Sequence, residues 1–75
     1  MDINKFITLF ADLFEDTDSS EITNSTSFRE LEEWDSLIAL ATLNMIEKKF
    51  GVKFTFDDMK KCETVEDLYN SIISK

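Results

Sequence analysis

The sequence predicts an all-α fold: a small four-helix bundle with three longer helices, one short helix and a long loop after the first helix. The 75 residues include one glycine and no proline, and chains so poor in turn-forming residues seldom build tight hairpins. Apolar residues also recur three and four positions apart, the spacing of a helix with one buried face. The length suits one small core, so residues 1–75 are expected to form a single domain.

The first helix is expected over about residues 2–14. Asp2 precedes an apolar stripe and is positioned to cap the helix. The side chains of the stripe recur at helical spacing and are Ile3, Phe6, Ile7, Phe10, Leu13 and Phe14.

A long polar loop is expected between residues 15 and 35. Asp, Ser, Thr and Asn dominate its first half, and these residues bond their own backbone in turns. Loops of this length are uncommon in small domains and usually carry function. Ser27 and Glu30 are spaced to cap a short turn. The apolar residues expected to attach the loop to the core are Ile22, Phe28 and Leu31.

The second helix is expected to begin at Ser36, with Asp35 as its cap. It is expected to end at Gly51, because glycine readily adopts the left-handed conformation of a helix stop. Lys48 and Lys49 precede that end, where the helix dipole favours cations. The face expected to be buried consists of Ala39, Leu43, Ile46 and Phe50.

Two threonines mark the starts of the last two helices. Thr55 is expected to cap a short helix over about residues 56–61, and Thr64 to cap the last helix, TVEDLYNSIIS. The side chains expected to face inward from the last helix are Val65, Leu68 and Ile72.

The residue inventory excludes most catalytic chemistry. The chain has no histidine, and Cys62 is its only cysteine. Internal disulfides, the common zinc clusters and histidine-dependent triads are therefore excluded. A lone cysteine without an activating histidine is typical of a small buried apolar residue. We expect a protein that is not an enzyme and holds no metal, from a reducing compartment.

The charge pattern indicates which partners the protein can bind. The net charge is −8, so nucleic acid phosphates would repel the protein and basic protein surfaces would attract it. Ten acidic residues lie in residues 1–35, whereas residues 36–56 carry a net charge of +2. No window approaches the roughly 20 apolar residues of a membrane span, and the N-terminal segment lacks the basic region of a signal peptide. A cytoplasmic location is expected.

The segment EEWDSLIAL, residues 32–40, places a serine at the first turn of the second helix. On its own, Asp-Ser before an apolar run is typical of an ordinary helix cap. A helix N-terminus also offers free N–H groups and the positive end of the dipole, and both favour a phosphate. A phosphodiester on Ser36 would therefore be stabilised there. Ser36 would need no activating base, because a modifying enzyme would supply the catalysis.

The chain resembles an acyl carrier protein over essentially its whole length. The resemblance rests on the apolar first helix, on the acidic loop with TSF at 26–28, and on DSL at 35–37. It rests further on IEKKFGVKF at 46–54 and TVEDLYNSI at 64–72. It implies that Ser36 carries a 4′-phosphopantetheine arm derived from coenzyme A, with Asp35 as the helix cap beside it. The thiol of that arm would carry acyl groups as thioesters.

The resemblance also implies two larger sets of functional residues in a monomeric carrier. One set would meet a phosphopantetheinyl transferase and the enzymes that load and transfer acyl groups in a fatty-acid, specialised acyl or polyketide pathway. These partner-binding residues are Trp34, Leu37, Ile38, Leu40, Ala41 and Glu47. The other set would line or border an acyl-chain cleft, or simply pack the core, and consists of Phe28, Leu43, Ile46, Val65 and Leu68.

The second helix departs from the family pattern in its charge. The family typically carries several acids on the outward face of this helix, and here Glu47 alone keeps that charge. Ile38 stands where an acid is common, and Trp34 directly precedes Asp35 where glycine is often found. These departures favour a dedicated carrier with its own partners over the general carrier of fatty-acid synthesis.

Two alternatives stay open at this stage. An amino-acid or peptidyl carrier uses the same serine chemistry, although such carriers usually show a glycine-rich run before the serine and a lower net charge. A small acidic adaptor or calcium-binding helical module is the other alternative, because Asp16, Asp18 and Ser20 have the opening spacing of a calcium loop. Glu21 and Ser27, however, stand where that loop requires glycine and a bidentate glutamate.

Overall fold

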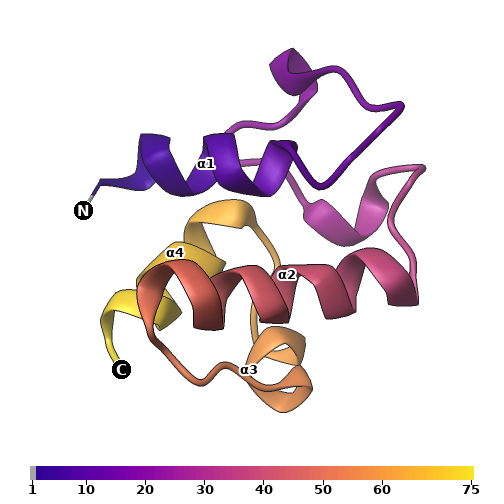
Figure 1. The fold of residues 1–75 in the computed structure, drawn as a ribbon. Coiled ribbons are helices and arrows are strands. Elements are labelled where there is room, and N and C mark those ends of the chain that lie inside the picture. Colours follow the sequence, from indigo (N-terminus) through magenta and orange to yellow (C-terminus); the bar gives the residue numbers. More distant parts are fainter. Residues whose placement is uncertain (1) are drawn as a thin grey trace.

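The computed structural model describes residues 2–75, and four α-helices build its core (Figure 1). The helices are α1 (Ile3–Ala11), α2 (Ser36–Phe50), α3 (Phe56–Lys60) and α4 (Val65–Ile73). α1 packs against both α2 and α4, and the short α3 lies beneath α2 in the view of Figure 1. The described residues form no β-strand. The predicted bundle of three longer helices, one short helix and a long loop is therefore confirmed.

α1 is shorter than the sequence predicted. Asp2 caps it as expected, with its carboxylate accepting a hydrogen bond from the Lys5 amide at 3.0 Å. The helix ends at Ala11 rather than near residue 14, because the amides of Leu13 and Phe14 bond to carbonyls three residues back, at 3.1 and 3.0 Å. That tighter turn ends the α-helical pattern, yet it still places Phe14 in the core.

The loop between α1 and α2 contains two 3₁₀ turns, η1 (Ser19–Glu21) and η2 (Phe28–Glu30). Ile22 and Phe28 are buried and Leu31 is half-buried against the core, as predicted. Ser27 precedes η2, but its side chain makes no capping hydrogen bond, so the cap predicted for this turn is wrong. Arg29, the middle residue of the turn, makes side-chain hydrogen bonds to the rest of the protein instead.

Arg29 ties the loop to the connection between α3 and α4. Its guanidinium donates hydrogen bonds to the Cys62 carbonyl at 2.6 Å and to the Lys60 carbonyl at 3.1 Å. The same group lies 4.9 Å from the ring centroid of Phe28, within cation–π range. One side chain thus connects residues more than thirty positions apart.

Glu33 ties the start of the loop to its end. Its carboxylate accepts hydrogen bonds from the Thr17 hydroxyl at 2.8 Å and from the amides of Glu15 and Asp16 at 2.8 and 3.0 Å. The bond from the Thr17 hydroxyl, together with those from the amides, lowers the pKa of Glu33. The chain segment that leads into α2 is therefore anchored immediately before the helix begins.

α2 has the predicted bounds but a different buried face. Its C-cap is Gly51, in the left-handed conformation with φ of 67°, after Lys48 and Lys49 in the last turn. Ala39 and Ile46 are buried as expected, whereas Leu43 and Phe50 are only half-buried. Thr42 and Met45 are buried in addition. Thr42 can be buried because its hydroxyl donates to the Ile38 carbonyl at 2.8 Å, which satisfies the polar group.

α3 and α4 begin with the predicted threonine caps. The Thr55 hydroxyl accepts from the Asp58 amide while Asp58 accepts from the Thr55 amide, and Thr64 and Asp67 form the same reciprocal pair. α3 ends at Lys60, one residue earlier than predicted. The residues that α4 buries are the three expected, Val65, Leu68 and Ile72.

Cys62 lies in the core between these two helices. It is 4% exposed, and its thiol is 3.5 Å from the Asp58 carbonyl. Burial raises the pKa of the Cys62 thiol. The prediction of a small buried residue is confirmed.

No helix in residues 2–75 combines the length and the apolar character needed to cross a membrane. The longest, α2, has 15 residues.

Candidate functional site

The first turn of α2 leaves several polar groups unpaired. The Asp35 carboxylate accepts a hydrogen bond from the Ile38 amide at 2.9 Å, which confirms Asp35 as the cap. Within the described residues, the Ser36 hydroxyl and the amides of Ser36 and Leu37 make no hydrogen bond. Ser36 is also exposed. A group attached to its hydroxyl would lie beside free N–H donors at the positive end of the helix, a favourable place for a phosphate.

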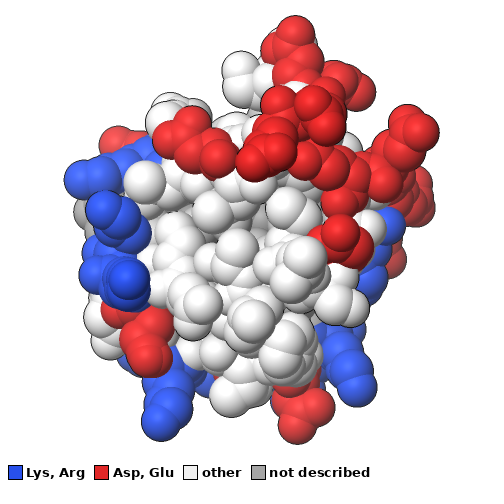
Figure 2. All heavy atoms as spheres, turned by 45° about the vertical axis from the view of Figure 1, so that its right-hand side comes forward, with Lys and Arg blue, Asp and Glu red and all other residues white. Residues whose placement is uncertain are grey.

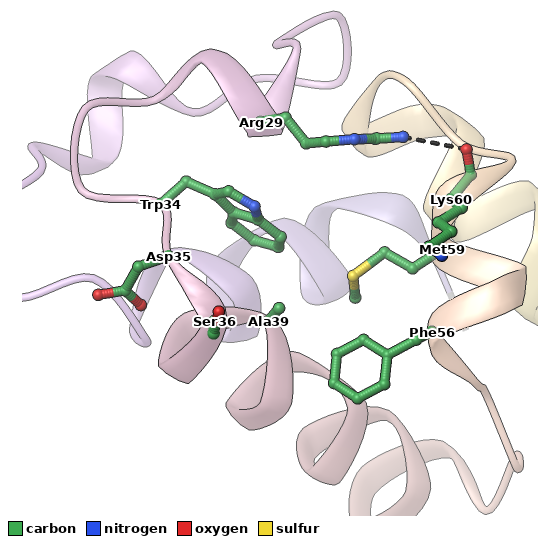
Figure 3. Close-up of a pocket in the computed structure, with 8 residues that line it drawn as sticks. All are labelled: Arg29, Trp34, Asp35, Ser36, Ala39, Phe56, Met59 and Lys60. Carbon is green, nitrogen blue, oxygen red and sulfur yellow. Dashed lines mark hydrogen bonds between the residues drawn. The ribbon is translucent and has the colours of Figure 1, made fainter.

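A pocket of about 420 Å³ adjoins Ser36, between the start of α2 and α3 (Figure 3). In Figure 3, Ser36 and Asp35 lie on one side of it, and α3 contributes the opposite side. Its surface is mostly apolar, with charged groups at the edges, and it lies within the size range of small-molecule sites. The lining residues are Arg29, Trp34, Asp35, Ser36, Ala39, Phe56, Met59 and Lys60.

Trp34 forms a wall of this pocket and is held there by other aromatic rings. Its ring centroid is 5.0 Å from that of Phe28 and 6.5 Å from that of Phe14. Packing of this kind fixes the indole in one orientation. The Trp34 side chain is half-buried. The part of it that packs on the core is not available to a partner, although the sequence suggested Trp34 as a partner-binding residue.

The five residues predicted to line an acyl-chain cleft do not line the pocket beside Ser36. None of them is among its lining residues. Four have no exposed surface, namely Phe28, Ile46, Val65 and Leu68, and Leu43 is half-buried. The structure therefore brings these residues together as packed core.

Sequence reasoning missed most of the pocket wall opposite Ser36. Phe56 and Met59 come from α3 and point towards the pocket in Figure 3. Their spacing of three residues places them on one helical face. That spacing was the available signal, but a helix this short could not be placed against α2 from the sequence.

The predicted partner surface is narrower than the sequence indicated. Leu37 is 75% exposed and Leu40 is 48% exposed, and Glu47 is also exposed. Ile38 and Ala41 are half-buried. Phe56, which was not among the predicted partner-binding residues, is 48% exposed and adds an exposed apolar side chain on α3.

This side of the molecule carries little charge. α2 has no charged residue from position 36 to position 46. Figure 2 shows a broad uncharged face, with acidic side chains along its upper border and basic side chains at its flanks. Electrostatic attraction to a partner would therefore act at the border of this face rather than at its centre.

Two of the residues that suggested a calcium loop, Asp18 and Ser20, bond to each other and stabilise the turn η1. The Asp18 carboxylate accepts a hydrogen bond from the Ser20 amide at 3.0 Å and caps η1, and this bond lowers the pKa of Asp18. In the part of the chain that the structure describes, no group of three or more acidic, histidine or cysteine side chains is arranged to hold a metal ion.

Comparisons with known proteins gave one result. Searches of curated proteins and of solved structures found no match. A scan against protein families matched residues 4–72 to the family described as the phosphopantetheine attachment site. Its members carry a covalently attached 4′-phosphopantetheine, and the exposed, unpaired serine beside an apolar pocket fits such a group. Because the match covers nearly the whole chain, the protein belongs to the phosphopantetheine attachment site family, the carrier domains of the acyl carrier protein type.

Proposed function

We propose that Ser36 is the attachment point of the arm, and that the protein carries acyl groups as thioesters and delivers them to biosynthetic enzymes. We further propose that it acts as a monomer in the cytoplasm. One observation carries the proposal: the Ser36 hydroxyl is exposed and unpaired at the start of a long helix, next to two free amides and an apolar pocket.

The first step is transfer of the arm from coenzyme A by a phosphopantetheinyl transferase. The Ser36 oxygen forms a phosphodiester and displaces the nucleotide part of coenzyme A. The proton of the hydroxyl leaves to a base of the transferase, because this chain has no histidine. The new phosphate lies beside the amides of Ser36 and Leu37, where the dipole of α2 favours its charge.

The pocket beside Ser36 is the proposed resting place of the arm and of the first part of its cargo. The apolar walls formed by Trp34, Phe56 and Met59 suit the methyl groups of the arm and a short acyl chain. Longer chains would reach the predicted cleft residues such as Ile46 and Leu68. Since these have no exposed surface, a long cargo must displace core side chains and should stabilise an expanded form of the bundle.

We propose a dedicated carrier rather than the general carrier of fatty-acid synthesis. The exposed Leu37, Leu40 and Phe56 form an apolar contact surface, and α2 lacks acids before Glu47. Recognition by apolar contact depends little on salt, whereas recognition by opposite charges weakens as salt is added. Leu37→Glu with Leu40→Glu should therefore impair transfer by the cognate enzymes and improve transfer by general fatty-acid enzymes.

Intact-protein mass spectrometry tests the attachment. The protein is treated with coenzyme A and a broad-specificity phosphopantetheinyl transferase, and the mass of one arm should appear. The Ser36→Ala variant should gain nothing, whereas the matched variant Ser20→Ala, which removes another exposed serine, should gain the arm. An arm on Ser36→Ala, or an unmodified wild-type protein, would refute the proposal.

A further inference from the structure

Glu33 lies three residues before Ser36 and connects the chain ahead of α2 to the segment that follows α1. Its carboxylate accepts hydrogen bonds from the Thr17 hydroxyl at 2.8 Å and from the amides of Glu15 and Asp16 at 2.8 and 3.0 Å. We call these three bonds the Glu33 clamp. Their donors are 16 to 18 positions away along the chain, so the clamp joins the two ends of the loop between α1 and α2.

The Glu33 clamp forms in an acidic environment. Glu33 makes no ion pair within residues 2–75, and the hollow that it lines is also lined by Asp16, Glu21 and Glu32. Like charges repel, so attraction between side chains does not explain why the Glu33 carboxylate lies here. Hydrogen bonds to an ionised acceptor are strong. The three bonds of the clamp therefore hold Glu33 in a place that its charge alone would not favour.

The residue after Glu33 attaches the same segment to the core. The ring centroid of Trp34 is 5.0 Å from that of Phe28, and the Trp34 amide donates to the Leu31 carbonyl at 3.0 Å. The clamp on one residue and the ring packing of the next restrict the backbone of both, and this restriction removes alternative conformations of the segment. Ser36 follows two residues later, so the orientation of the first turn of α2 depends on these two attachments.

We propose, on the basis of the proposed function, that Glu33 is a positioning residue for attachment of the arm. The Glu33 clamp holds the start of α2 in the orientation in which a transferase meets the Ser36 hydroxyl. Glu33 takes no part in the transfer itself, in which the phosphodiester forms on the Ser36 oxygen and the nucleotide part of coenzyme A leaves. When the clamp opens, the segment ahead of α2 gains other conformations, and a smaller fraction of the molecules presents Ser36 to the enzyme.

Two competing explanations for Glu33 make different predictions. If Glu33 only added to the negative charge that attracts a basic enzyme, the adjacent Glu32, which is exposed, should matter as much. If the clamp only stabilised the fold, its loss should not affect attachment at temperatures well below unfolding. Thr17 distinguishes the proposal from both, because its hydroxyl belongs to the clamp but carries no charge and lies at the other end of the loop.

The experiment measures the kinetics of arm attachment with the apo protein as the varied substrate of a broad-specificity transferase. Glu33→Gln keeps the shape of the side chain, but its amide nitrogen cannot accept a hydrogen bond. Thr17→Val removes the hydroxyl donor, and the double variant carries both changes. One control is Glu32→Gln, the same change of charge one residue earlier. The other is Thr64→Ala, which removes the cap of α4 and is expected to affect stability alone.

Glu33→Gln and Thr17→Val should each raise the KM for the apo protein about three- to tenfold with little change in kcat, because fewer free molecules are competent to bind. The double variant should be little worse than Glu33→Gln, since both changes weaken the same clamp. Both controls should stay within about twofold of the wild type. The fluorescence of Trp34, the only tryptophan in the chain, should change in the apo form of the clamp variants and not in the controls.

A KM that Glu32→Gln raises as much as Glu33→Gln would overturn the inference, and so would wild-type kinetics in Thr17→Val. An equal loss in Thr64→Ala would assign the effect to stability and would also overturn it. Thr17→Val keeps the charge of the loop and tests the clamp even if Glu33→Gln does not fold. Failure of the proposed function is distinguishable, because the mass spectrum would then show no arm on the wild type, whereas Trp34 fluorescence is measured before any arm is attached.

Discussion

Two helices of this bundle have the same kind of N-terminal cap but differ in whether the first amides after the cap are hydrogen-bonded. α2 begins after Asp35 and α4 begins after Thr64, and in both the side chain of the cap accepts a hydrogen bond from an amide three residues on. At α4, carbonyls of the loop accept hydrogen bonds from the next two amides. The Thr26 carbonyl accepts from the Val65 amide at 3.0 Å, and the Asn24 carbonyl accepts from the Glu66 amide at 2.9 Å. At α2, the corresponding amides have no partner among the described residues.

The difference is that the loop pairs the first amides of one helix and leaves those of the other unpaired. Every α-helix leaves its first amides unpaired, and something must satisfy them. The loop satisfies those of α4, which binds the loop to the bundle through the bridge between Ser27 and Thr64. It leaves those of α2 to solvent or to a bound group. The same loop therefore pairs the first amides of α4 and continues directly into α2, whose first amides stay unpaired.

Removing the buried anchor of the loop should have the largest effect. Phe28 has no exposed surface, so Phe28→Ala should lower the free energy of unfolding by about 3–5 kcal/mol. It should also speed hydrogen exchange at the Val65 and Glu66 amides, because the loop that covers them loosens. Denaturant unfolding and amide exchange measure the two effects.

The control for this comparison is Leu37→Ala, since Leu37 is 75% exposed and should change stability by less than about 0.5 kcal/mol. If Phe28→Ala does not fold, Phe28→Leu provides a smaller truncation of the same side chain. A Phe28→Leu protein with unchanged stability and unchanged exchange at Val65 would contradict the account.

The two caps should matter about equally for stability but differently for function. Thr64→Ala and Asp35→Ala should each cost about 1 kcal/mol. Only Asp35→Ala alters the helix start at which we propose that the arm is attached, so it alone should slow loading by the transferase. The measurements are denaturant unfolding and the initial rate of arm attachment. A Thr64→Ala protein that loaded as slowly as Asp35→Ala would remove the distinction between the two starts.

Acid should weaken the starts of α3 and α4. The hydrogen bonds from Lys75 and the Thr55 amide lower the pKa of Asp58 from 3.8 to about 2, and amides at the start of α4 lower the pKa of Asp67. Because the folded pKa is below the unfolded one, this stabilisation is present above about pH 4 and is lost as the pH falls towards 2. Urea unfolding at pH 4, 3 and 2 should show the loss.

Asp58→Asn should make that pH dependence shallower, since the variant has no carboxylate to protonate at this position. An equally steep decline in wild type and in Asp58→Asn would assign the acid sensitivity to other carboxylates.

The smallest expected change is in thiol reactivity. Burial raises the pKa of Cys62, and the residue is 4% exposed, so the thiol of the apo protein should react slowly with a thiol reagent. Attachment of the arm adds an exposed thiol and should create one fast-reacting equivalent. A fast phase in the apo protein would show that Cys62 is more accessible than the structure indicates.

The helix caps could be predicted because they are local. Asp2, Asp35, Thr55 and Thr64 each bond an amide three residues away, and Gly51 adopts its left-handed conformation within one turn. Such features depend on short stretches of sequence, so residue type and spacing are enough. Ser36, the serine proposed to carry the arm, belongs with them, since its place at a helix start follows from the cap that precedes it.

The pocket could not be predicted because it depends on distant contacts. Arg29 reaches it through bonds to residues 60 and 62, and Phe56 and Met59 approach Ser36 only because of how α3 packs. Thr42 was missed for a related reason: polar residues are usually exposed, and only the bond to the Ile38 carbonyl permits its burial. The residues predicted to line an acyl-chain cleft pack in or against the core, and their place relative to the pocket also depends on distant contacts, while their role stays a prediction.

The central claim is that the first amides of α2 are free to bind the phosphate of the arm, whereas those of α4 are already bonded. Comparing the backbone amide NMR signals of the apo and holo protein tests this claim most directly. Attachment of the arm should shift the backbone amide signals of Ser36 and Leu37 strongly, because a phosphate then lies beside unpaired N–H groups. The signals of Val65 and Glu66 should stay in place, because the loop carbonyls already bind those amides. Unchanged signals at Ser36 and Leu37 after attachment, or larger shifts at Val65 and Glu66, would contradict the account.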